Sequence, residues 1–580
     1  MQKVPLRQYA SLLVQYLRPQ WFRVMLLTFF MFGGIGLNLL GPQILRDFID
    51  TAKAGGALRS LIIGGTLFLV VSVFSQIIRL ISSYLGQDVG WRATNRMRGD
   101  LALHCLNLDM WFHHEHTPGE MIERVDGDTT TLSNFFSEFV LQVIGSTFFL
   151  IGILILVFRE DWRIGAVMAA FSIVAFWVYN LTRSIAVPVY TAEREGYSSL
   201  YGFLEERLIG IEDIRTNGGN AYTMDRFHDV NRNVFRRVLK SEIMGEVLLS
   251  ITRVLFAFGH AATMGMSIYL FREGAFTIGT VFMVFQYTAR LRQPLNQISR
   301  QINDLQKATA GLRRIEELYR TESNIQDGTE TLPASGPLSV EFDDVSFGYV
   351  EADPVLKDMS FQLSPGKVLG LLGRTGSGKT TMTRLLFRFY DVNSGQIRIG
   401  GMPIMKIRLD SLRHHIGLVT QDVQLFHATV RENLALFNPA IPDERILAVI
   451  KELGLAVWYD SLSDGLDTMI TSGGLSAGEA QLLAFARVFL QDPGIVILDE
   501  PSSRLDPVTE GRIDRAVRKL LHNRTGIIIA HRLATVERVD EIMILEDGRI
   551  REHGDRETLA KNANSRFSQL LKTGLEEVIT

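Results

Sequence analysis

The chain has 580 residues and a mass of 65.3 kDa, and its 60 Lys and Arg residues nearly balance its 63 Asp and Glu residues, for a formal net charge of −3. This balance argues against a nucleic-acid-binding protein, which usually has a basic excess, and the 47% apolar content excludes a disordered chain. The single cysteine, Cys105, excludes a disulfide framework and a cysteine-rich metal site.

Apolar runs in the first half of the chain predict six membrane-spanning helices. These spans are expected at about residues 24–45, 60–78, 139–158, 164–182, 254–271 and 275–295. Because about 20 helical residues cross the hydrocarbon core, the first four runs are long enough by themselves. The last two require that flanking charged side chains reach the interface or face a polar interior. Buried helices of a soluble protein would explain one such run, but not this series.

Two long connections, 79–138 and 183–253, are predicted to be helices that continue the spans into water. With six crossings they lie on the same side as both termini, and that side carries most of the Lys and Arg residues. The positive-inside rule therefore places the termini in the cytoplasm. Residues 1–23 lack acidic side chains, as a transit peptide would, but their single serine and their aromatic residues suit a helix on the membrane surface. A bacterial inner membrane is favoured over an organelle.

The transmembrane domain is predicted to cover residues 1–320, followed by a linker over 321–337 and an α/β domain over 338–580. The linker is rich in Gly, Pro, Ser, Thr and acidic residues. In the last domain, short β-rich runs such as 368–372 alternate with helical stretches, as expected for a parallel sheet covered by helices.

The strand at 368–372 runs into the pattern G-x-x-x-x-G-K-T, which is typical of a phosphate-binding loop. The loop and the first turn of the next helix comprise Gly373, Arg374, Thr375, Gly376, Ser377, Gly378, Lys379, Thr380 and Thr381. The glycines let backbone N–H groups curl around phosphate oxygens. Lys379 is expected to reach the β- and γ-phosphates of ATP, and Thr380 to ligate Mg²⁺.

A second apolar strand, 494–498, ends in Asp499 and Glu500. Its unbroken apolar run suits a strand that is buried on both faces. Asp499 at the tip can hold Mg²⁺ through water, and Glu500 is placed to polarise an attacking water. The alternative, two solvated acids on a loop, is disfavoured because a phosphate-binding loop lies upstream in the same domain. The two motifs together predict a site for nucleotide phosphate and Mg²⁺, which the family resemblance below identifies as that of an ATPase with ATP and Mg²⁺ as cofactors.

The segment Leu475-Ser476-Ala477-Gly478-Glu479 precedes an apolar helix, and with it the chain resembles an ATP-binding-cassette (ABC) exporter half-transporter of the type IV fold. The resemblance covers nearly the whole chain and implies an all-α six-helix transmembrane domain followed by an α/β P-loop ATPase domain. It also implies further site residues, matched by the order of the family's motifs. They are Tyr349 stacking on adenine, Gln421 sensing Mg²⁺, Ser476 to Glu479 as the signature loop, Asp506 in the D-loop and His531 as the switch histidine.

In this family two nucleotide-binding domains face each other head to tail, and each ATP lies between the phosphate loop of one and the signature of the other. The family signature reads Leu-Ser-Gly-Gly-Gln, from which Ala477 and Glu479 depart. The Ala477 methyl crowds the approach to the γ-phosphate, and Glu479 places a negative charge near it, partly offset by the helix dipole. The hypothesis is that the chain pairs with a different half-transporter, and a heterodimer is favoured over a homodimer.

The resemblance implies ATP-driven export or flipping of an unidentified hydrophobic or amphipathic substrate, in contact with membrane lipid and without nucleic acid. Two alternatives stay open: an ATP-gated channel or regulatory protein of the same architecture, and an importer with an exporter-like layout. Coupling between the domains is expected through residues 111–125 and 206–217. Charged residues near the ends of the apolar runs are expected to reach the interface or lie in the cytoplasmic extensions: Arg79, Glu246, Arg253, Arg290 and Arg292.

Overall fold

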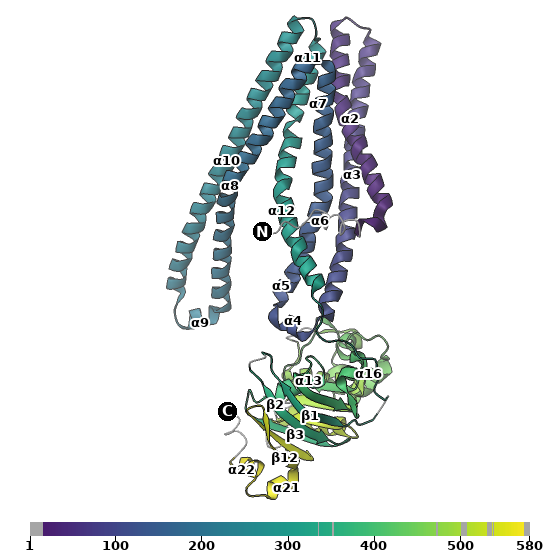
Figure 1. The fold of residues 1–580 in the computed structure, drawn as a ribbon, viewed down its shortest axis with the longest axis vertical. Helices are drawn as coiled ribbons and strands as arrows, with labels where there is room; N and C mark the ends of the chain where they lie inside the picture. Colours follow the sequence, from purple (N-terminus) through teal and green to yellow (C-terminus); the bar gives the residue numbers. More distant parts are fainter. Residues whose placement is uncertain are drawn as a thin grey trace. The chain divides into compact units, whose positions relative to one another are not determined.

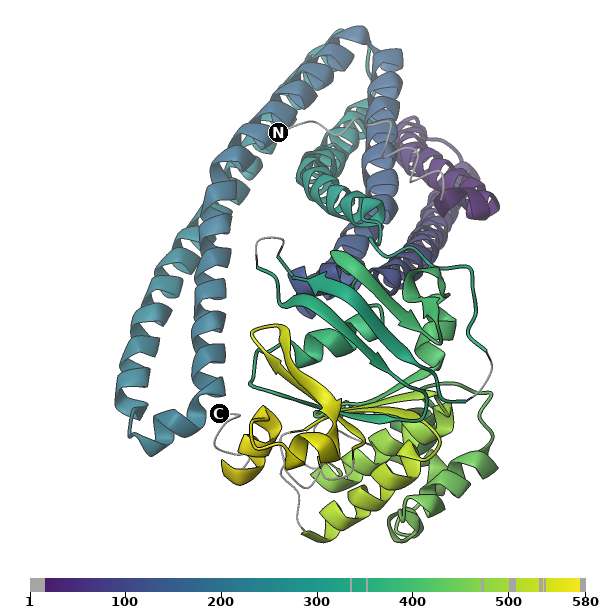
Figure 2. The same cartoon turned by 60° about the horizontal axis from the view of Figure 1, so that its bottom comes forward.

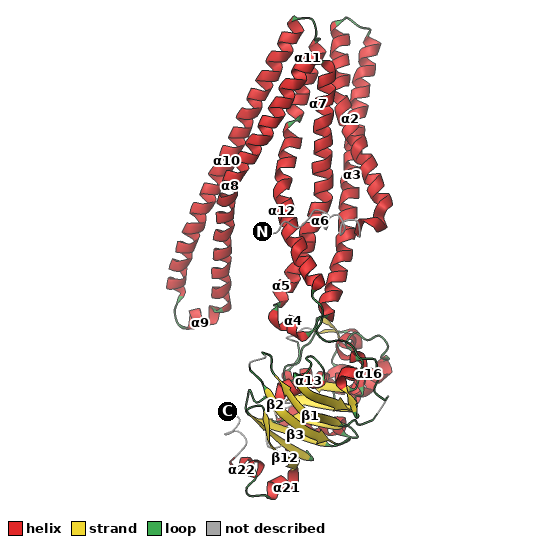
Figure 3. Cartoon of the chain, in the orientation of Figure 1, coloured by secondary structure: helices red, strands yellow, loops and turns green. Residues whose placement is uncertain are grey.

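The computed structural model describes residues 16–333, 336–350, 353–470, 474–499, 507–530, 536 and 539–573. Two compact units make up the chain, the first from Met1–Asn107 and His116–Thr321, the second from Leu108–Glu115 and Glu322–Thr580. Among the described residues, regular structure in the first unit is helical, and the named strands lie in the second unit (Figure 3). The predicted fold class, a helical domain followed by an α/β domain, is confirmed.

The first unit is built from long helices joined by short connections (Figure 1). They are η1 (Arg18–Gln20), α2 (Trp21–Lys53), α3 (Leu58–Asn107), α5 (Pro118–Ile122), η2 (Glu123–Asp128), α6 (Thr129–Glu138), η3 (Phe139–Ile144), α7 (Gly145–Glu160), α8 (Trp162–Ile209), α9 (Ile211–Thr216), α10 (Asn220–Arg272), α11 (Ile278–Arg290) and α12 (Arg292–Arg320). Helices α8 and α10 run side by side as a hairpin that α9 closes (Figures 1 and 2).

Within the described residues, five helical segments are long and apolar enough to cross a membrane: Arg18–Lys53, Leu58–Asn107, Gln142–Glu160, Trp162–Ile209 and Asn220–Arg272. At 1.5 Å per residue, the 50 residues of α3 extend about 75 Å, well beyond the roughly 30 Å hydrocarbon core. Helices α3, α8 and α10 are therefore longer than a crossing requires and contain much of the two long connections, whereas the end of the first connection consists of shorter helices. That these parts lie in water stays a prediction. The sixth predicted span, 275–295, falls on α11, which has 13 residues, and on the start of α12. Its crossing stays a prediction.

A proline inside α2 explains the position of one charged side chain in the first unit. Pro42 has no N–H to donate to the carbonyl of Asn38, one turn earlier. Arg290 of α11 supplies the missing donor, with 2.5 Å from its Nη1 to Asn38 O, and the Tyr287 hydroxyl donates to Leu39 O at 2.7 Å. Arg290 is partly buried and contacts α2, whereas the sequence predicted that it would reach the interface or lie in a cytoplasmic extension.

The second unit combines two sheets with helices. The strands are β1 (Val340–Phe347), β2 (Leu356–Leu363), β3 (Val368–Gly373), β4 (Ser394–Ile399), β5 (Met402–Pro403), β6 (Ile416–Val419), β7 (Ala428–Thr429), β8 (Met469–Ile470), β9 (Ile495–Asp499), β10 (Thr525–Ile529), β11 (Glu541–Glu546) and β12 (Arg549–Asp555). The helices are α4 (Met110–Glu115), α13 (Lys379–Leu386), η4 (Ile404–Lys406), α14 (Leu409–His414), α15 (Val430–Ala435), α16 (Asp443–Glu452), α17 (Ala456–Asp460), η5 (Gly465–Asp467), α18 (Ala477–Gln491), α19 (Pro507–Leu521), α21 (Arg556–Lys561) and α22 (Arg566–Thr573).

The larger sheet has the order β12-β11-β3-β10-β9-β6, in which all pairs are parallel except β11 with β12. Side chains along its strands point alternately into two apolar cores, because successive residues of a strand face opposite sides of the sheet. Val496 and Leu498 belong to the core under α15, α16 and α18, whereas Ile495 and Ile497 belong to the core shared with the antiparallel sheet β2-β1-β4-β5. This double burial holds the carboxyl ends of β3, β9 and β6 at one edge of the sheet.

Candidate functional site

The loop between β3 and α13 has the backbone shape that the predicted phosphate-binding loop requires. Gly376 and Gly378 adopt left-handed conformations, with φ of 84° and 104°. Gly378 is the N-cap of α13, where a side chain would be strained by the φ of 104° and its Cβ would lie 2.5 Å from Leu356 Cδ2, which would have to move. The loop can therefore wrap around an anion at the positive end of α13.

Two side chains of this loop show that it fits a phosphate group. The buried Lys379 ammonium donates to Gly373 O at 2.6 Å and to Arg374 O at 2.9 Å, which holds the cation within the loop. The Ser377 hydroxyl is buried and has no hydrogen-bond partner among the described residues. A buried hydroxyl without a partner is costly, and a phosphate oxygen would satisfy it.

The ladder of the sheet places Asp499 at the same edge as the phosphate loop. Ile529 of β10 pairs with Leu371 on one side and with Asp499 on the other, so Asp499 lies two strands, about 10 Å, from β3. Gln421 follows the end of β6, which pairs with β9. Oxygen atoms of Thr380, Gln421 and Asp499 are the hard ligands that Mg²⁺ prefers. The described residues hold no ready-made cluster of three His, Cys, Asp or Glu ligands, so these oxygens fit Mg²⁺ only together with phosphate oxygens and water.

Tyr349, the predicted adenine-stacking residue, is held in place by polar and aromatic contacts. Its hydroxyl accepts a hydrogen bond from Arg384 Nη1 at 3.0 Å and shares another with Thr381 Oγ1 at 3.3 Å. Its ring meets Phe347 and Tyr390 edge to face, at centroid distances of 5.1 and 5.2 Å. Burial raises the pKa of Tyr390 above its ordinary value, so this ring stays neutral. The orientation of Tyr349 is thus fixed relative to the phosphate loop.

The short helix α4 belongs to this aromatic cluster, although it follows α3 of the first unit in the chain. Trp111 of α4 lies 5.1 Å from Tyr390, 6.2 Å from Tyr349 and 6.3 Å from Phe347, measured between ring centroids. Asp109 fixes the start of α4, because its Oδ1 accepts from the Phe112 N–H at 3.1 Å, and its Oδ2 accepts from the Asn324 N–H at 2.6 Å. Sequence reasoning proposed residues 111–125 as a contact segment, and only those up to Glu115 belong to the second unit.

Sequence reasoning missed Asp109, Arg384 and Tyr390 as parts of this site. Phe347, two positions before Tyr349, belongs to the recognised motif, but nothing in the sequence indicated that Tyr390 and Trp111 would pack against Tyr349.

The altered signature forms a closed hydrogen-bonded cap at the start of α18. Ser476 is the N-cap, and Glu479 Oε2 accepts from the Ser476 backbone N–H at 2.9 Å and from its hydroxyl at 2.8 Å. In return, the Ser476 hydroxyl accepts from the Glu479 N–H at 3.3 Å, which completes a capping box. Ala477 is exposed, and a Cβ on the buried Gly478 would lie 2.2 Å from Thr509 Cγ2. The Glu479 carboxylate therefore already occupies the N-terminal end of α18.

Glu500, Asp506 and His531 lie outside the described residues. Their predicted roles rest on the sequence.

Comparison with known proteins agrees with this architecture. Residues 24–295 match the family described as the ABC transporter transmembrane region, and residues 356–503 match the family described as ABC transporter. The chain is 27% identical over 568 residues to an ATP-dependent lipid A-core flippase of Alcanivorax borkumensis, with 97% of each chain covered. It is 30% identical over 464 residues to a fatty acid ABC transporter ATP-binding/permease protein of Mycobacterium bovis, covering 79% of this chain and 73% of that protein. A solved structure of a bacterial Atm1-family ABC exporter with ATP bound has a TM-score of 0.78 at 24% identity, over 96% of this chain and 98% of that one.

Long apolar helices joined to an α/β unit with a phosphate-binding loop define an ATP-driven membrane transporter. The chain belongs to the ABC transporter family, and it carries one membrane region and one nucleotide-binding domain, as the half-transporter resemblance predicted. It binds ATP and is an ATPase whose hydrolysis is coupled to transport across a membrane.

Proposed function

We propose that the protein is one half of a dimeric exporter or flippase that moves a hydrophobic or amphipathic molecule out of the cytoplasm or across the cytoplasmic membrane of a bacterium. The observation that carries this proposal is the phosphate loop, with its buried Ser377 hydroxyl, in the same chain as helices long enough to cross a membrane. The lipid A-core flippase and the fatty acid transporter among its relatives support a lipid-like substrate. Both termini and the ATPase domain then lie in the cytoplasm, on the basic side of the membrane.

We assign the site residues the following roles in ATP binding. The N–H groups from Gly373 to Gly378 hold the phosphates, and Lys379 exchanges its carbonyl partners for the γ-phosphate. Bound Mg²⁺ would neutralise charge on the phosphate oxygens, held by the oxygens of Thr380, Gln421 and Asp499. Tyr349 offers its ring face to adenine.

Hydrolysis needs three further side chains, which lie outside the described residues and whose roles are inferred from the sequence. By the roles that the family motifs imply, Glu500 polarises the attacking water, His531 interacts with the γ-phosphate, and Asp506 interacts with the partner domain. A water held between Glu500 and the phosphate is oriented for in-line attack, which is the main contribution of such residues in phosphoryl transfer.

Replacing Glu500 tests this mechanism. In Glu500→Gln, ATP affinity should stay within about twofold, while hydrolysis and ATP-driven transport should fall by about 100-fold or more, since general-base catalysis contributes about 10²–10⁴-fold. ATP binding is measured by equilibrium titration, and transport in sealed vesicles. A variant that keeps transport would reject the exporter and favour a role in which ATP binding alone acts, as in a gated channel.

The capping box supports an asymmetric, heterodimeric assembly. The family signature, with glutamine in place of Glu479, can form the same cap but brings no negative charge to the γ-phosphate held by the partner domain. Here the Glu479 carboxylate occupies the Ser476 N–H and hydroxyl and adds a negative charge beside the approaching phosphate. The ATP site that this signature closes is therefore weak, and a different partner chain would supply the stronger signature. A stable dimer of this chain alone, with full substrate-stimulated ATPase activity, would exclude it.

A further inference from the structure

The chain passes between the two units three times, after Asn107, after Glu115 and after Thr321. The first passage follows the end of α3, and the third follows the end of α12. Helices α3 and α12 therefore each continue directly into the second unit, the first through α4 and the second through the predicted linker. One carboxylate, that of Asp109, joins the beginnings of these two segments.

Asp109 uses its two oxygens for two different segments of the chain. Its Oδ1 accepts from the Phe112 N–H at 3.1 Å, within the first turn of α4. Its Oδ2 accepts from the Asn324 N–H at 2.6 Å and from the Ser323 hydroxyl at 3.4 Å, beyond the end of α12. Asp109 is only 8% exposed, so these hydrogen bonds to a charged acceptor are shielded from water and are strong.

Helices α3 and α12 are also joined within the first unit, shortly before they leave it. In the last turn of α3, His104 Nε2 lies 2.9 Å from the carbonyl oxygen of Leu318 and donates to it. Leu318 lies in the last turn of α12, where backbone carbonyls lack partners within the helix. The His104 ring also lies 5.6 Å from that of Tyr319, measured between centroids. The two passages are thus held together both before and after the chain enters the second unit.

We propose that Asp109 is a positioning residue that makes α4 and the start of the linker move as one piece, so that a change at the nucleotide site reaches α3 and α12 together. Trp111 packs α4 against Tyr349, which is expected to stack on adenine. The Asp109 carboxylate carries a displacement of α4 to the backbone of Asn324. This inference rests on the proposed role of Tyr349 and is independent of the substrate and of the direction of transport.

An amide at position 109 cannot make both contacts. A carboxylate has two acceptor oxygens, whereas the side chain of asparagine has one acceptor oxygen and one NH₂ group, which would face an N–H. Asp109→Asn should therefore release either α4 or the linker while the size of the side chain stays almost the same. Either release breaks the connection between the two segments.

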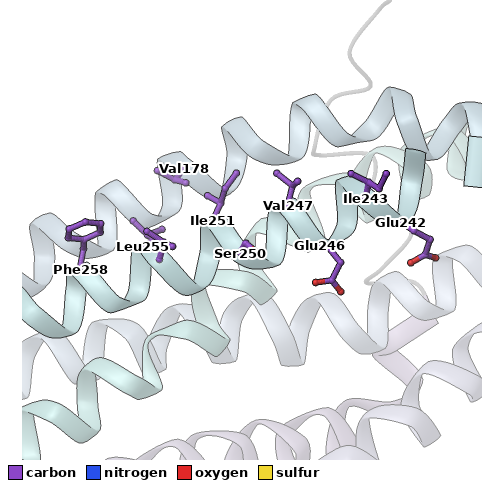
Figure 4. A pocket seen from close by; sticks show the side chains of 10 residues that line it. Val178, Glu242, Ile243, Glu246, Val247, Ser250, Ile251, Leu255 and Phe258 are labelled. Carbon is purple, nitrogen blue, oxygen red and sulfur yellow. The ribbon is translucent and has the colours of Figure 1, made fainter. Parts of the chain in front are cut away.

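Hydrogen–deuterium exchange of the full-length chain in lipid nanodiscs, with and without Mg²⁺ and a non-hydrolysable ATP analogue, tests the proposal. In the wild type, the analogue should slow exchange in the phosphate loop, 373–381, and change it in the segment 321–325. In Asp109→Asn, the protection of the phosphate loop should remain, while the nucleotide-induced change in 321–325 should become about twofold smaller or less. A merely structural role would raise exchange equally in both states and leave this difference intact. Exchange in the segment 243–258 of α10 (Figure 4) reports on the general stability of the first unit and should not change.

Asp327→Asn is the matched control, because Asp327 is a second carboxylate of the same linker. It accepts from the Leu409 N–H at 2.7 Å and so joins the linker to the start of α14 instead of α4. The variant should keep the full nucleotide-induced change in 321–325.

A covalent link at the same place should replace the carboxylate. Disulfides join Cα atoms about 4.4–6.8 Å apart, which suits a side chain that reaches the neighbouring backbone. Asp109→Cys/Asn324→Cys, with Cys105→Ser to remove the single native cysteine, should form this disulfide on oxidation and recover the nucleotide-induced change that its reduced form lacks.

Three results would each overturn the proposal: an unchanged response in Asp109→Asn, an equal loss of response in Asp327→Asn, and a disulfide that fails to form or to restore the response. A wild type whose phosphate loop is not protected by the analogue would reject the nucleotide site itself, on which the proposal rests. That failure is therefore distinguishable from a failure of the Asp109 connection.

Discussion

Glu432 shows at the scale of one residue what a capping carboxylate does in the second unit. It closes a capping box with Thr429 at the start of α15, and its Oε2 accepts from the Thr429 N–H and hydroxyl, both at 2.9 Å. The backbone hydrogen bond from Thr429, followed by that of its hydroxyl, holds the pKa of the Glu432 carboxyl below its ordinary value of 4.5. A carboxyl with a lowered folded-state pKa stabilises the fold above its unfolded-state pKa and loses this contribution as the pH falls through the lower value.

Glu432→Gln should therefore lower the melting temperature slightly at pH 7, and the difference from wild type should shrink once the pH falls below about 4.5. Glutamine keeps a capping oxygen but does not titrate, so the variant isolates the charge. Thermal unfolding of the detergent-solubilised protein between neutral and acidic pH measures the effect. Glu444→Gln, at an exposed glutamate near the start of α16, is the control. A difference that grows on acidification would contradict the assignment.

Arg290 shows why residue-level prediction stops short of tertiary contacts. From the sequence it was one of several charges near the end of an apolar run that were expected to reach the interface or to lie in the cytoplasmic extensions. The structure directs it to the Asn38 carbonyl, freed by Pro42 in a helix distant along the chain. Pro42 and Arg290 are each readable in the sequence, but their meeting depends on how α11 packs against α2.

At the scale of elements, α4 is the clearest link between the two units along the chain. The chain leaves the first unit after Asn107, contributes Leu108–Glu115 to the second, and returns to the first at His116. Trp111 holds this segment against Tyr349 and Tyr390, next to the proposed adenine site. We expect a shift of Tyr349 on nucleotide binding to move α4, which the chain connects directly to α3.

Trp111→Ala should weaken the coupling between substrate transport and ATP hydrolysis. Aromatic pairs contribute about 0.5–1.5 kcal/mol each, so losing the tryptophan should weaken α4 docking and reduce substrate stimulation of ATPase activity by about fivefold to tenfold. ATP affinity should change much less, because the Arg384 and Thr381 bonds to Tyr349 remain. Trp458→Ala, which removes a tryptophan packed in the other core of the unit, should lower stability without the selective loss of stimulation. Equal effects of the two variants would assign Trp111 to packing alone.

Elements with a strong local pattern were predictable from the sequence, whereas their boundaries and contacts depended on packing. The unbroken apolar run at β9 and the glycine pattern before α13 identified the sheet edge and the phosphate loop. The break at Leu291 between α11 and α12 was not foreseen, because the flanking residues continue a helical pattern. The Ser476–Glu479 box has the S-x-x-E spacing of a capping box, so it was predictable from the sequence. Glu479 was instead interpreted only as a replacement of the glutamine of the family signature.

At the scale of the whole molecule, the capping boxes of Glu432 and Glu479 have the same geometry but different roles. That of Glu432 begins a helix, whereas that of Glu479 lies in the segment that matches the family signature, which we propose closes over the ATP of a partner domain. In a dimer of two copies of this chain, both ATP sites would be closed by altered signatures. In a heterodimer, one site would be closed by the partner's signature and would turn over normally. The assembly is then asymmetric because of two residues, Ala477 and Glu479.

Restoring the family signature in this chain tests that asymmetry. The Ala477→Gly/Glu479→Gln variant, purified alone, should hydrolyse ATP about tenfold faster than the wild-type chain, because removing a carboxylate beside the γ-phosphate recovers roughly 1–2 kcal/mol of helix-terminus attraction. Glutamine retains the cap, so the fold of α18 is kept and the gain reports the charge and the methyl group. Glu432→Gln, which changes the same residue type in the other box, should leave hydrolysis unchanged. A wild-type chain that already reaches the variant's rate by itself would show that the altered signature is fully active and that a homodimer suffices.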